Sequence, residues 1–226
     1  MKHTRKHQTG LVLLGILTLT ALLLGSVWAA RAASDWYVRD DGDDALCNGT
    51  TDADASFNPN CAFKTIQKGI DSAAAGDTVH VGAGTYAESK GGWRDIELFK
   101  GINLIGAGAG ATIVELSNLQ HGLEIRGTSA TTLVQGITIT KKATNTNSAA
   151  WAVIVEDVGS SFTKLTFQDV EIGYASGRNL YLGNNTYSDI VLDGVNVHDA
   201  SNPTSSVWGM SVRGTISQMT ITNSHF

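Results

Sequence analysis

The 226-residue sequence has little of several residue types. It contains only two prolines and two cysteines, and charged residues make up 16% of the chain. Low charge together with 42% hydrophobic residues excludes a disordered chain, which needs high charge and low hydrophobicity. The shortage of charged residues also argues against a coiled coil, which is rich in Glu, Lys and Arg.

Basic residues are scarce beyond the N-terminus. Residues 1–33 contain four of the 16 basic residues and no carboxylate, which leaves 12 basic against 21 acidic residues in the rest of the chain. The formal net charge is −5 for the whole chain and −9 for residues 34–226. Because so acidic a chain has no basic block, we expect no nucleic-acid partner.

The N-terminal residues have the three parts of an export signal. Basic residues precede an apolar run at residues 11–24, and small residues follow it. We therefore predict a signal peptide over residues 1–33, cleaved after Ala29 or Ala32, and a secreted or cell-surface protein. The alternative is an uncleaved anchor helix, because this segment is about long enough to span a bilayer. We expect no membrane span after signal cleavage, since no later stretch is apolar enough.

The two cysteines fit an exported protein. Cys47 and Cys61 are 14 positions apart in a polar loop. A disulfide that closes such a loop stabilises a protein by about 3 kcal/mol, and disulfides persist outside the cytoplasm. Zinc binding would need a nearby His or a third Cys at ligand spacing, which the loop lacks. We predict a disulfide between them.

The same loop contains the candidate metal ligands. Asp40, Asp41, Asp43 and Asp44 surround a glycine and supply the oxygen ligands that calcium prefers. The run lacks the spacing and the terminal Glu of an EF-hand, so a solvated turn is the alternative. Calcium is the one cofactor that the sequence suggests.

One helical pattern follows the predicted signal. Phe63, Ile66 and Ile70 share a face of residues 62–75, and a glycine after them is a natural helix stop. We predict an N-terminal cap over residues 34–76, made of the disulfide loop and this helix.

The rest of the chain, residues 77–226, repeats a strand pattern. A strand recurs at intervals of roughly 29 residues, with first positions at Val79, Ile102, Ile137, Val170, Val195 and Ser224. In later units a second strand precedes it, and its apolar positions should form two inward ladders: Leu123, Ile125, Val153, Val155, Leu180, Leu182, Met210 and Val212. Units this short bury their apolar faces only by stacking, which predicts a solenoid.

An antiparallel β-sandwich is the alternative fold. It would need two-residue hairpin turns, and Asp193-Gly194 is the one tempting pair. That pair recurs in register at residues 135–136, 168–169 and 222–223, which favours the corner of a coil.

Four segments carry a family resemblance: Trp36-Tyr37-Val38, Phe63-Lys64-Thr65-Ile66-Gln67, Gly76-Asp77-Thr78-Val79-His80-Val81 and Gly84-Thr85-Tyr86-Ala87-Glu88. They resemble the N-terminal cap and first coil of secreted proteins of the pectate-lyase-like fold. The resemblance implies an all-β fold, a right-handed parallel β-helix solenoid with an N-terminal capping α-helix. It implies no single chemistry, because this fold carries lyases, hydrolases, epimerases, adhesins and tailspikes.

The chain departs from this family at its C-terminus. It stops at Phe226 inside a strand, without a capping segment. We therefore expect either the N-terminal portion of a longer protein or end-to-end self-association, since an open solenoid end templates pairing.

Outward positions stack from coil to coil and can be interpreted as columns. Arg126, Glu156 and Arg213 fall in one column, which predicts either an exposed ion pair or a site where arginine binds the carboxylate of an acidic sugar. In lyases of the resembled fold, an Arg or Lys acts as base beside calcium-binding Asp residues. The resemblance therefore extends the candidate catalytic residues to Arg126, Arg213, Glu156, Asp157, Asp169, Asp193 and Asp199.

Tryptophans are the candidate substrate-binding residues. Trp151 and Trp208 lie at strand or loop edges, where an aromatic face suits the apolar face of a pyranose, and packing in the core is the alternative. His198 and Asp199 form an adjacent acid–base pair, but neighbours in a strand point to opposite faces.

Two functions remain open from the sequence. The first is a secreted or cell-surface β-helix repeat protein that binds an extracellular polysaccharide or surface glycan, or acts as an adhesive solenoid, without a recognisable catalytic site. The second is a polysaccharide lyase or glycoside hydrolase acting on an extracellular acidic polysaccharide.

Overall fold

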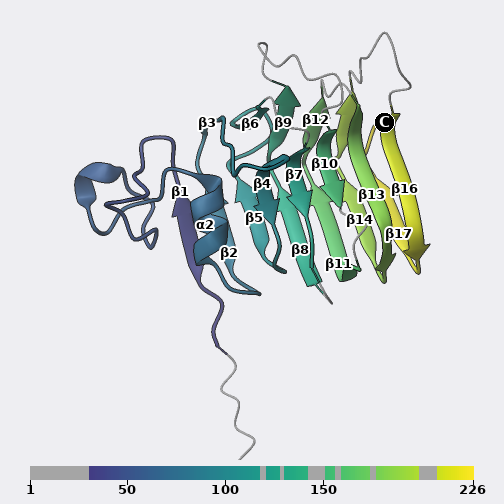
Figure 1. The fold of residues 1–226 in the computed structure, drawn as a ribbon, viewed down its shortest axis with the longest axis horizontal. Helices are drawn as coiled ribbons and strands as arrows, with labels where there is room; N and C mark the ends of the chain where they lie inside the picture. The colour runs from purple at the N-terminus through teal and green to yellow at the C-terminus, as the bar shows by residue number, and fades with distance from the viewer. Residues whose placement is uncertain are drawn as a thin grey trace, which may run out of the picture. The chain divides into compact units, whose positions relative to one another are not determined.

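Short parallel strands make up most of the regular structure in the computed structural model (Figure 1). Residues Ala33–Phe226 form one compact unit, separate from Met1–Ala32. The structure describes residues 31–117, 121–127, 130–141, 151–155, 159–173, 177–198 and 208–226. The predicted signal peptide therefore lies almost wholly outside the described residues.

The strands form three faces that the chain visits in turn (Figure 1). The first face contains β1 (Asp35–Val38), β2 (Thr78–Val81), β5 (Asn103–Gly106), β8 (Ala130–Gln135), β11 (Ser161–Gln168), β14 (Ile190–Asp193) and β17 (Met219–Thr222). The second contains β3 (Gly84–Tyr86), β6 (Thr112–Leu116), β9 (Thr138–Lys141), β12 (Glu171–Gly173) and β15 (Asn196–His198). The third contains β4 (Arg94–Leu98), β7 (His121–Ile125), β10 (Trp151–Val155), β13 (Arg178–Tyr187) and β16 (Trp208–Ile216).

Every pairing between these strands is parallel, within a face and between neighbouring coils. The chain thus returns to each face one rung further along, which defines a right-handed parallel β-helix and confirms the predicted fold. The long strands β13 and β16 run from the third face into the first, so β13 pairs with both β10 and β11.

The capping helix is shorter than predicted. Helix α2 spans Ile66–Ser72 rather than 62–75, and a 3-10 turn, η1, spans Ala55–Phe57 in the disulfide loop. Thr65 caps the helix with its hydroxyl, and Ala73 is already extended, so neither flanking segment continues the helical backbone. The interior face of the helix is as predicted, since Ile66 and Ile70 are fully buried.

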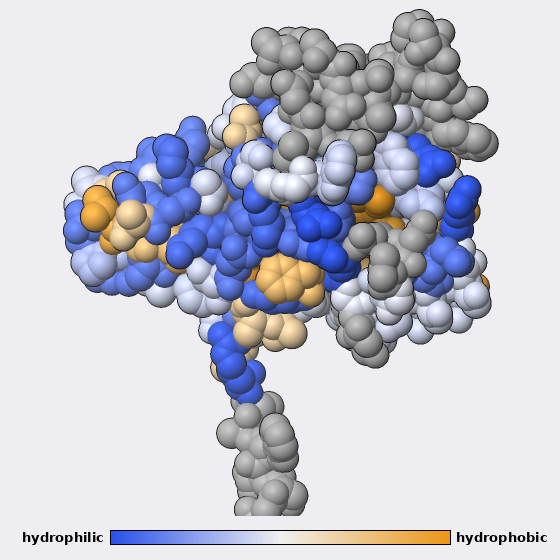
Figure 2. All heavy atoms as spheres, viewed as in Figure 1, coloured by the Kyte–Doolittle hydropathy of each residue, from blue (hydrophilic) through white to orange (hydrophobic). Residues whose placement is uncertain are grey.

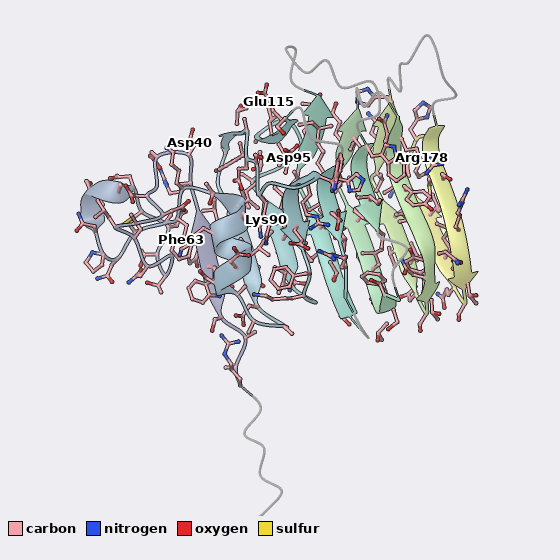
Figure 3. The ribbon with its side chains drawn as sticks, viewed as in Figure 1. Asp40, Phe63, Lys90, Asp95, Glu115 and Arg178 are labelled. Atoms are coloured by element: carbon pink, nitrogen blue, oxygen red, sulfur yellow. A yellow bond between two sulfur atoms is a disulfide. The ribbon has the colours of Figure 1, made fainter. Side chains whose placement is uncertain are left out.

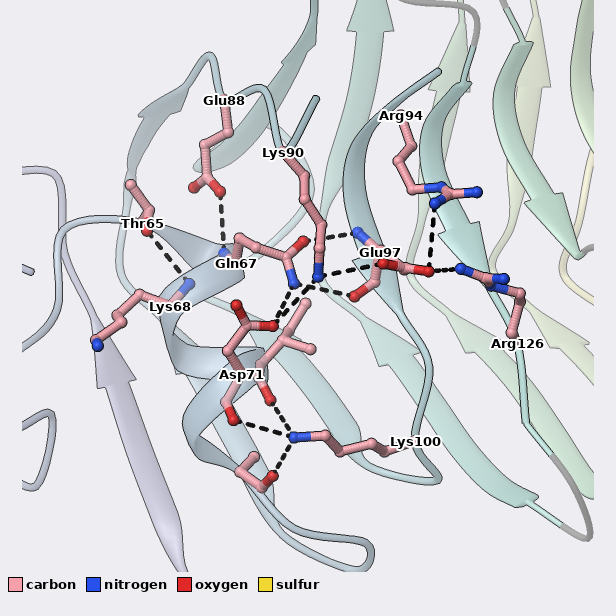
Figure 4. Close-up of polar contacts among 12 residues, drawn as sticks. Thr65, Gln67, Lys68, Asp71, Glu88, Lys90, Arg94, Glu97, Lys100 and Arg126 are labelled. Carbon is pink, nitrogen blue, oxygen red and sulfur yellow. Dashed lines mark hydrogen bonds and ion pairs between the residues drawn. The ribbon is translucent and has the colours of Figure 1, made fainter. Parts of the chain in front are cut away.

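Charged side chains satisfy both ends of α2 (Figure 4). Glu88 accepts hydrogen bonds from the amides of Ile66 at 2.5 Å and Gln67 at 2.9 Å. Lys100 donates to the carbonyls of Ile70 and Ala73 at the other end. These contacts replace the backbone partners that a helix lacks at its ends.

The predicted disulfide is present. Cys47 and Cys61 are bonded, and Cys61 is fully buried while Cys47 is 8% exposed. A backbone hydrogen bond also holds the loop that precedes α2, because the amide of Gly49 donates to the carbonyl of Cys61 at 2.9 Å.

The two predicted ladders of the third face are confirmed. Leu123, Val153, Leu180 and Met210 are register partners, as are Ile125, Val155, Leu182 and Val212. All are buried except Met210, which is partly buried, and Val212, which is 38% exposed. These side chains fill the interior of the solenoid, where burial of apolar area drives folding.

The predicted alignment of the recurring strand is wrong for its first two members. Val79 and Ile102 belong to the first face, whereas Ile137, Val170 and Val195 introduce strands of the second face. The true partners of Val79 continue along the first face as Leu104, Val134, Phe167, Leu192 and Ile221. Both faces follow the same apolar–polar–apolar pattern, so periodicity alone does not distinguish their strands.

The recurring two-residue turn is a corner of the coil, as predicted. Its second residue has a left-handed backbone in each coil, with φ of 63° at Gly136, 51° at Asp169, 66° at Gly194 and 51° at Asn223. The amides of the first three donate to carbonyls one rung further on, at 2.9–3.0 Å. Glycine, Asp and Asn are the residues that tolerate this conformation.

The last described rung exposes apolar side chains that earlier rungs bury. Ile221 and Phe226 are 50% and 45% exposed, whereas Leu192, the partner of Ile221, is fully buried. End-to-end self-association stays a prediction.

Across the described residues, no helix is both long and apolar enough to cross a membrane.

The inward register predicts the effect of one charge. Leu180→Asp should lower the free energy of unfolding by more than about 4 kcal/mol or prevent folding, because it buries a carboxylate without a partner. Thr186→Asp, at an exposed position of the same strand, should change it by less than about 0.5 kcal/mol. Urea unfolding followed by circular dichroism measures both, and a cooperative, near-native Leu180→Asp variant would refute the register.

The cap of α2 predicts a pH dependence. Burial raises the pKa of Glu88 from 4.5 to about 7, against the opposing effect of the two amide hydrogen bonds. Between these values the folded protein retains a proton that the unfolded chain releases, so the free energy of unfolding should fall as pH rises through this window. Glu88→Gln keeps an acceptor oxygen and should remove this part of the slope, on the order of 2 kcal/mol. Urea unfolding at about pH 5 and about pH 8 measures it.

Glu115→Gln, as control, should keep the wild-type slope, and an unchanged slope in Glu88→Gln would contradict the assignment.

Candidate functional site

Charged and aromatic side chains gather on the outward side of four adjacent third-face strands, β4, β7, β10 and β13 (Figure 3). The third-face cluster consists of Lys90, Arg94, Glu97, His121, Glu124, Arg126, Trp151, Arg178 and Tyr181. Parallel pairing brings its members side by side, because Arg94 pairs with His121, His121 with Trp151, and Glu97 with Glu124. Figure 2 shows that the surface here is mostly hydrophilic, with a small hydrophobic area within it.

Glu97 binds three cations at the edge of the cluster (Figure 4). Its carboxylate contacts Lys90 Nζ at 3.1 Å, Arg94 Nη1 at 3.5 Å and the guanidinium of Arg126. Its backbone is fixed by α2, since Gln67 Oε1 accepts from the Glu97 amide at 2.7 Å and Gln67 Nε2 donates to the Glu97 carbonyl at 3.2 Å. The helix thus covers the free edge of β4 and positions the carboxylate.

Glu124 lies at the centre of the cluster and is fully buried. Its Oε2 is 2.8 Å from His121 Nδ1 and 3.0 Å from Arg94 Nε, and its Oε1 is 3.2 Å from Arg126 Nε. Burial alone would raise the pKa of Glu124, but hydrogen bonds from His121 and Arg94 outweigh it and hold the pKa below its ordinary value. The carboxylate is therefore a fixed negative charge at neutral pH.

The carboxylates lie beneath the cations. The side chains of Glu97 and Glu124 are 10% and 0% exposed, whereas those of Lys90, Arg94 and Arg126 are 29%, 25% and 33% exposed. The cluster therefore presents ammonium and guanidinium groups to the solvent, although the chain as a whole carries a formal charge of −5.

An aromatic stack continues the cluster along the solenoid. The ring of Trp151 stacks on that of His121, with 5.4 Å between ring centres, and packs against that of Tyr181 in a T-shaped arrangement, with 5.2 Å between ring centres. The guanidinium of Arg178 lies 4.6 Å from the ring centres of both Trp151 and Tyr181. Since His121 and Arg178 come from the rungs on either side of Trp151, they cover both faces of its ring. Trp151 therefore offers an edge, not the open face expected of a sugar-stacking platform.

Arg178 differs from the other arginines of the cluster. Among the residues that the structure describes, no carboxylate forms an ion pair with it, and its guanidinium lies against the two aromatic rings. A guanidinium held on aromatic faces keeps its donors available for a bidentate anion.

The structure brings together two of the residues predicted from sequence. Arg126 and Trp151 both belong to the third-face cluster. Arg213 is exposed on β16 of the same face, without an ion pair among the described residues. Trp208 begins β16, but its side chain lies outside the described residues, as do Glu156, Asp157 and Asp199.

Asp193 and Asp169 lie elsewhere. Asp193 ends β14 on the first face, and accepts hydrogen bonds from Thr222 at 2.8 Å and Asn223 at 2.9 Å, which lower its pKa. Asp169 occupies a left-handed corner of the coil. Neither is combined with Arg126 in one site.

His198 contacts Glu171 on the preceding rung, with 2.9 Å between Nε2 and Oε1.

The aspartates proposed as calcium ligands have separate partners. Asp41 binds Arg39 at 2.7 Å, Asp43 accepts from the amides of Ala45 and Leu46, and Asp44 accepts from the hydroxyl of Thr65 at 2.7 Å. In the described ranges, no group of three or more His, Cys, Asp or Glu side chains is placed to hold a metal ion. Calcium at Asp40, Asp41, Asp43 and Asp44 stays a prediction.

Sequence reasoning missed the centre of the cluster. Glu97 and Glu124 occupy the same position in two apolar–Glu–apolar segments, Ile96-Glu97-Leu98 and Leu123-Glu124-Ile125. Strand alternation turns both side chains outward on neighbouring rungs. Recognising the earlier segment as a third-face strand would have revealed the pair.

The chain belongs to the family described as "Protein of unknown function (DUF1565)", whose model matches residues 48–224. No curated protein matches the sequence significantly.

Several solved structures are similar at low identity. Pectin methylesterase PemA from Erwinia chrysanthemi has 14% identity and a TM-score of 0.46, with 86% of this chain and 66% of that chain covered. A pectin methylesterase in complex with hexasaccharide VII has 13% identity and a TM-score of 0.45, with 85% and 67% covered. A mutant pectin methylesterase with hexasaccharide IV has 12% identity, the same TM-score and the same coverage.

The buried charge of Glu124 predicts a stability change. Glu124→Gln should lower the free energy of unfolding at neutral pH by roughly 1–3 kcal/mol, because Arg94 and Arg126 lose their buried counter-charge. A carboxyl with a lowered pKa stabilises the fold above its ordinary pKa and stops doing so as pH falls through the folded value. The difference between wild type and variant should therefore shrink below about pH 4.

Denaturant unfolding at neutral and acidic pH measures this difference. Glu171→Gln, which removes a half-buried carboxylate paired with His198, is the matched control and should change stability by less than about 1 kcal/mol. An equal effect of the two variants, or a Glu124→Gln effect that does not depend on pH, would contradict the assignment.

Proposed function

We propose that this protein is a glycan-binding β-helix whose third-face cluster binds an acidic polysaccharide without cleaving it. The observation that carries the proposal is the exposure of the cations above buried carboxylates. Arg94 and Arg126 are held in place by Glu97 and Glu124 yet remain partly exposed, and Arg178 has no described counter-charge. Guanidinium groups fixed in this way suit sugar carboxylates, which they bind through paired hydrogen bonds.

The spacing of the rungs supports an extended ligand. Parallel strands lie about 4.8 Å apart, which is close to the length of one pyranose unit. Arg94 lies on β4, Arg126 directly follows β7 and Arg178 begins β13, so a chain of acidic sugars that runs along the solenoid would meet a cation on three of four adjacent rungs. A single small anion would use only part of this surface.

A binding role fits the cluster better than lyase or hydrolase chemistry. Glycoside hydrolysis needs a carboxylic acid that stays protonated near neutrality, whereas the pKa of Glu124 is lowered. A guanidinium paired with two carboxylates, as in Arg126, is a fixed cation and a poor proton acceptor. Both properties serve recognition of an anion.

We place this function outside the cytoplasm, at the cell surface or as a secreted protein. The disulfide between Cys47 and Cys61 supports an oxidising compartment, and the signal-like pattern of residues 1–33 supports export.

Calorimetric titration with matched oligosaccharides tests the proposal. An oligogalacturonate should bind, with an affinity that falls as salt rises, and its fully methyl-esterified counterpart should bind at least about tenfold more weakly. Arg178→Gln should weaken binding of the acidic oligosaccharide about tenfold, because it removes a cation without breaking a described ion pair.

The control is Lys164→Ala, which removes a cation that is 51% exposed on the first face and should leave the affinity unchanged. Chromatography of the oligosaccharide after incubation should recover it intact. Equal affinity for the acidic and esterified ligands would refute the preference for an acidic ligand. Shortened products would show that the protein cleaves the polysaccharide instead of only binding it.

A further inference from the structure

A hollow of about 230 Å³ lies on the first face, away from the third-face cluster. It opens where β1, β2 and β5 end and the chain turns toward the second face. The residues that line it are Tyr37, Asp52, His80, Val81, Gly82, Ile105, Gly106 and Ala107. The proposed function uses none of these residues.

One wall is built from two stacked rings. Tyr37 and His80 are register partners on β1 and β2, and their rings lie 5.2 Å apart with an angle of 18° between the planes. His80 Nε2 is 3.0 Å from Asp35 Oδ1. A carboxylate only accepts hydrogen bonds, so Nε2 carries a proton, and Nδ1 is an acceptor in the neutral form of the ring. No described group hydrogen-bonds to Nδ1.

The floor has almost no side chains. Gly82, Gly106 and Ala107 form it, and a Cβ at Gly106 would lie 2.2 Å from the carbonyl oxygen of Gly136, which excludes other residues there. The fully buried Thr112 fixes this floor from below. Its hydroxyl accepts from the amide of Ala107 at 2.9 Å and lies 3.0 Å from the carbonyl of Gly82, so the two corners are joined.

The rim carries a carboxylate that acts as a hydrogen-bond acceptor. Asp52 belongs to the disulfide loop, and its Oδ1 accepts from Arg39 at 3.2 Å, while Arg39 also binds Asp41. The second oxygen of Asp52 has no described partner. The hollow thus combines acceptors at Asp52 and His80 with the hydroxyl of Tyr37, over a floor that lets a ligand approach the backbone.

We propose that this hollow binds a neutral sugar unit. Two acceptors and a hydroxyl match the neighbouring hydroxyl groups of a pyranose, which are donors. The carboxylates of Asp35 and Asp52 repel an acidic sugar, because the single cation Arg39 is shared between Asp41 and Asp52 and leaves the rim with a net negative charge. The protein therefore has two carbohydrate sites of opposite preference, the third-face cluster for acidic units and this hollow for neutral ones.

Chemical-shift mapping of the full protein tests the proposal with two probes that share one ring. Methyl galactoside should shift the amides of Gly82 and Ala107 and saturate at millimolar concentration. Methyl galacturonoside, its carboxylate counterpart, should bind there at least about tenfold more weakly. Shifts at the third-face cluster are scored separately, so failure of one site is distinguished from failure of the other.

Three variants define the site. Ala107→Leu fills the hollow from an exposed position and should abolish the shifts caused by methyl galactoside. His80→Phe keeps an aromatic ring on Tyr37, removes the acceptor and should weaken binding about fivefold to tenfold. Gln135→Ala lies two rungs further along the same outward column and should leave binding unchanged.

Three results would overturn the proposal. The first is the absence of saturable shifts at Gly82 and Ala107 with methyl galactoside. The second is equal binding of both probes in the hollow. The third is tighter binding of methyl galactosamine, which would show that the site prefers a cationic ligand.

Discussion

Parallel pairing in register is the constraint on which the rest of this molecule depends. Because each coil stacks directly on the last, a residue type at one strand position meets the same position of the next coil about 4.8 Å away. Apolar side chains at inward positions thus form continuous ladders such as Leu123, Val153 and Leu180. The same rule forces outward side chains into rows, so a binding surface arises wherever a row has consistent chemistry.

The third-face cluster shows how such a row tolerates charge. Glu97 and Glu124 are stacked like charges, which would repel each other alone. Arg94 and Arg126 each contact both carboxylates, so the repulsion is neutralised within one network. Since the carboxylates are buried and the cations partly exposed, the network both stabilises the fold and leaves a positive surface. The first-face hollow follows the opposite pattern, with Asp52 on its rim and a glycine floor.

The fold could be predicted from the sequence because a solenoid repeats the same strand and corner pattern in each coil. Alternation, the recurring strand and the recurring corner at Gly136, Asp169, Gly194 and Asn223 each pointed to one architecture, and the structure agrees. The first two rungs were misaligned, since the first and second faces share one apolar pattern. The site could be predicted only in part from the sequence, for a related reason. Arg126 and Trp151 stand out as residue types, but Glu97 and Glu124 look like ordinary strand residues until β4 is recognised. The stack of His121 and Arg178 on Trp151 depends on side-chain geometry, which periodicity does not encode.

The central claim is that exposed cations held over buried carboxylates bind acidic sugars along the third face. A crystal structure of the protein with an oligogalacturonate tests it most directly. The account predicts sugar carboxylates within hydrogen-bond distance of Arg126 and Arg178, on a chain that runs along the solenoid axis across successive rungs. An oligosaccharide bound on another face, or one whose carboxylates point away from these guanidinium groups, would contradict it.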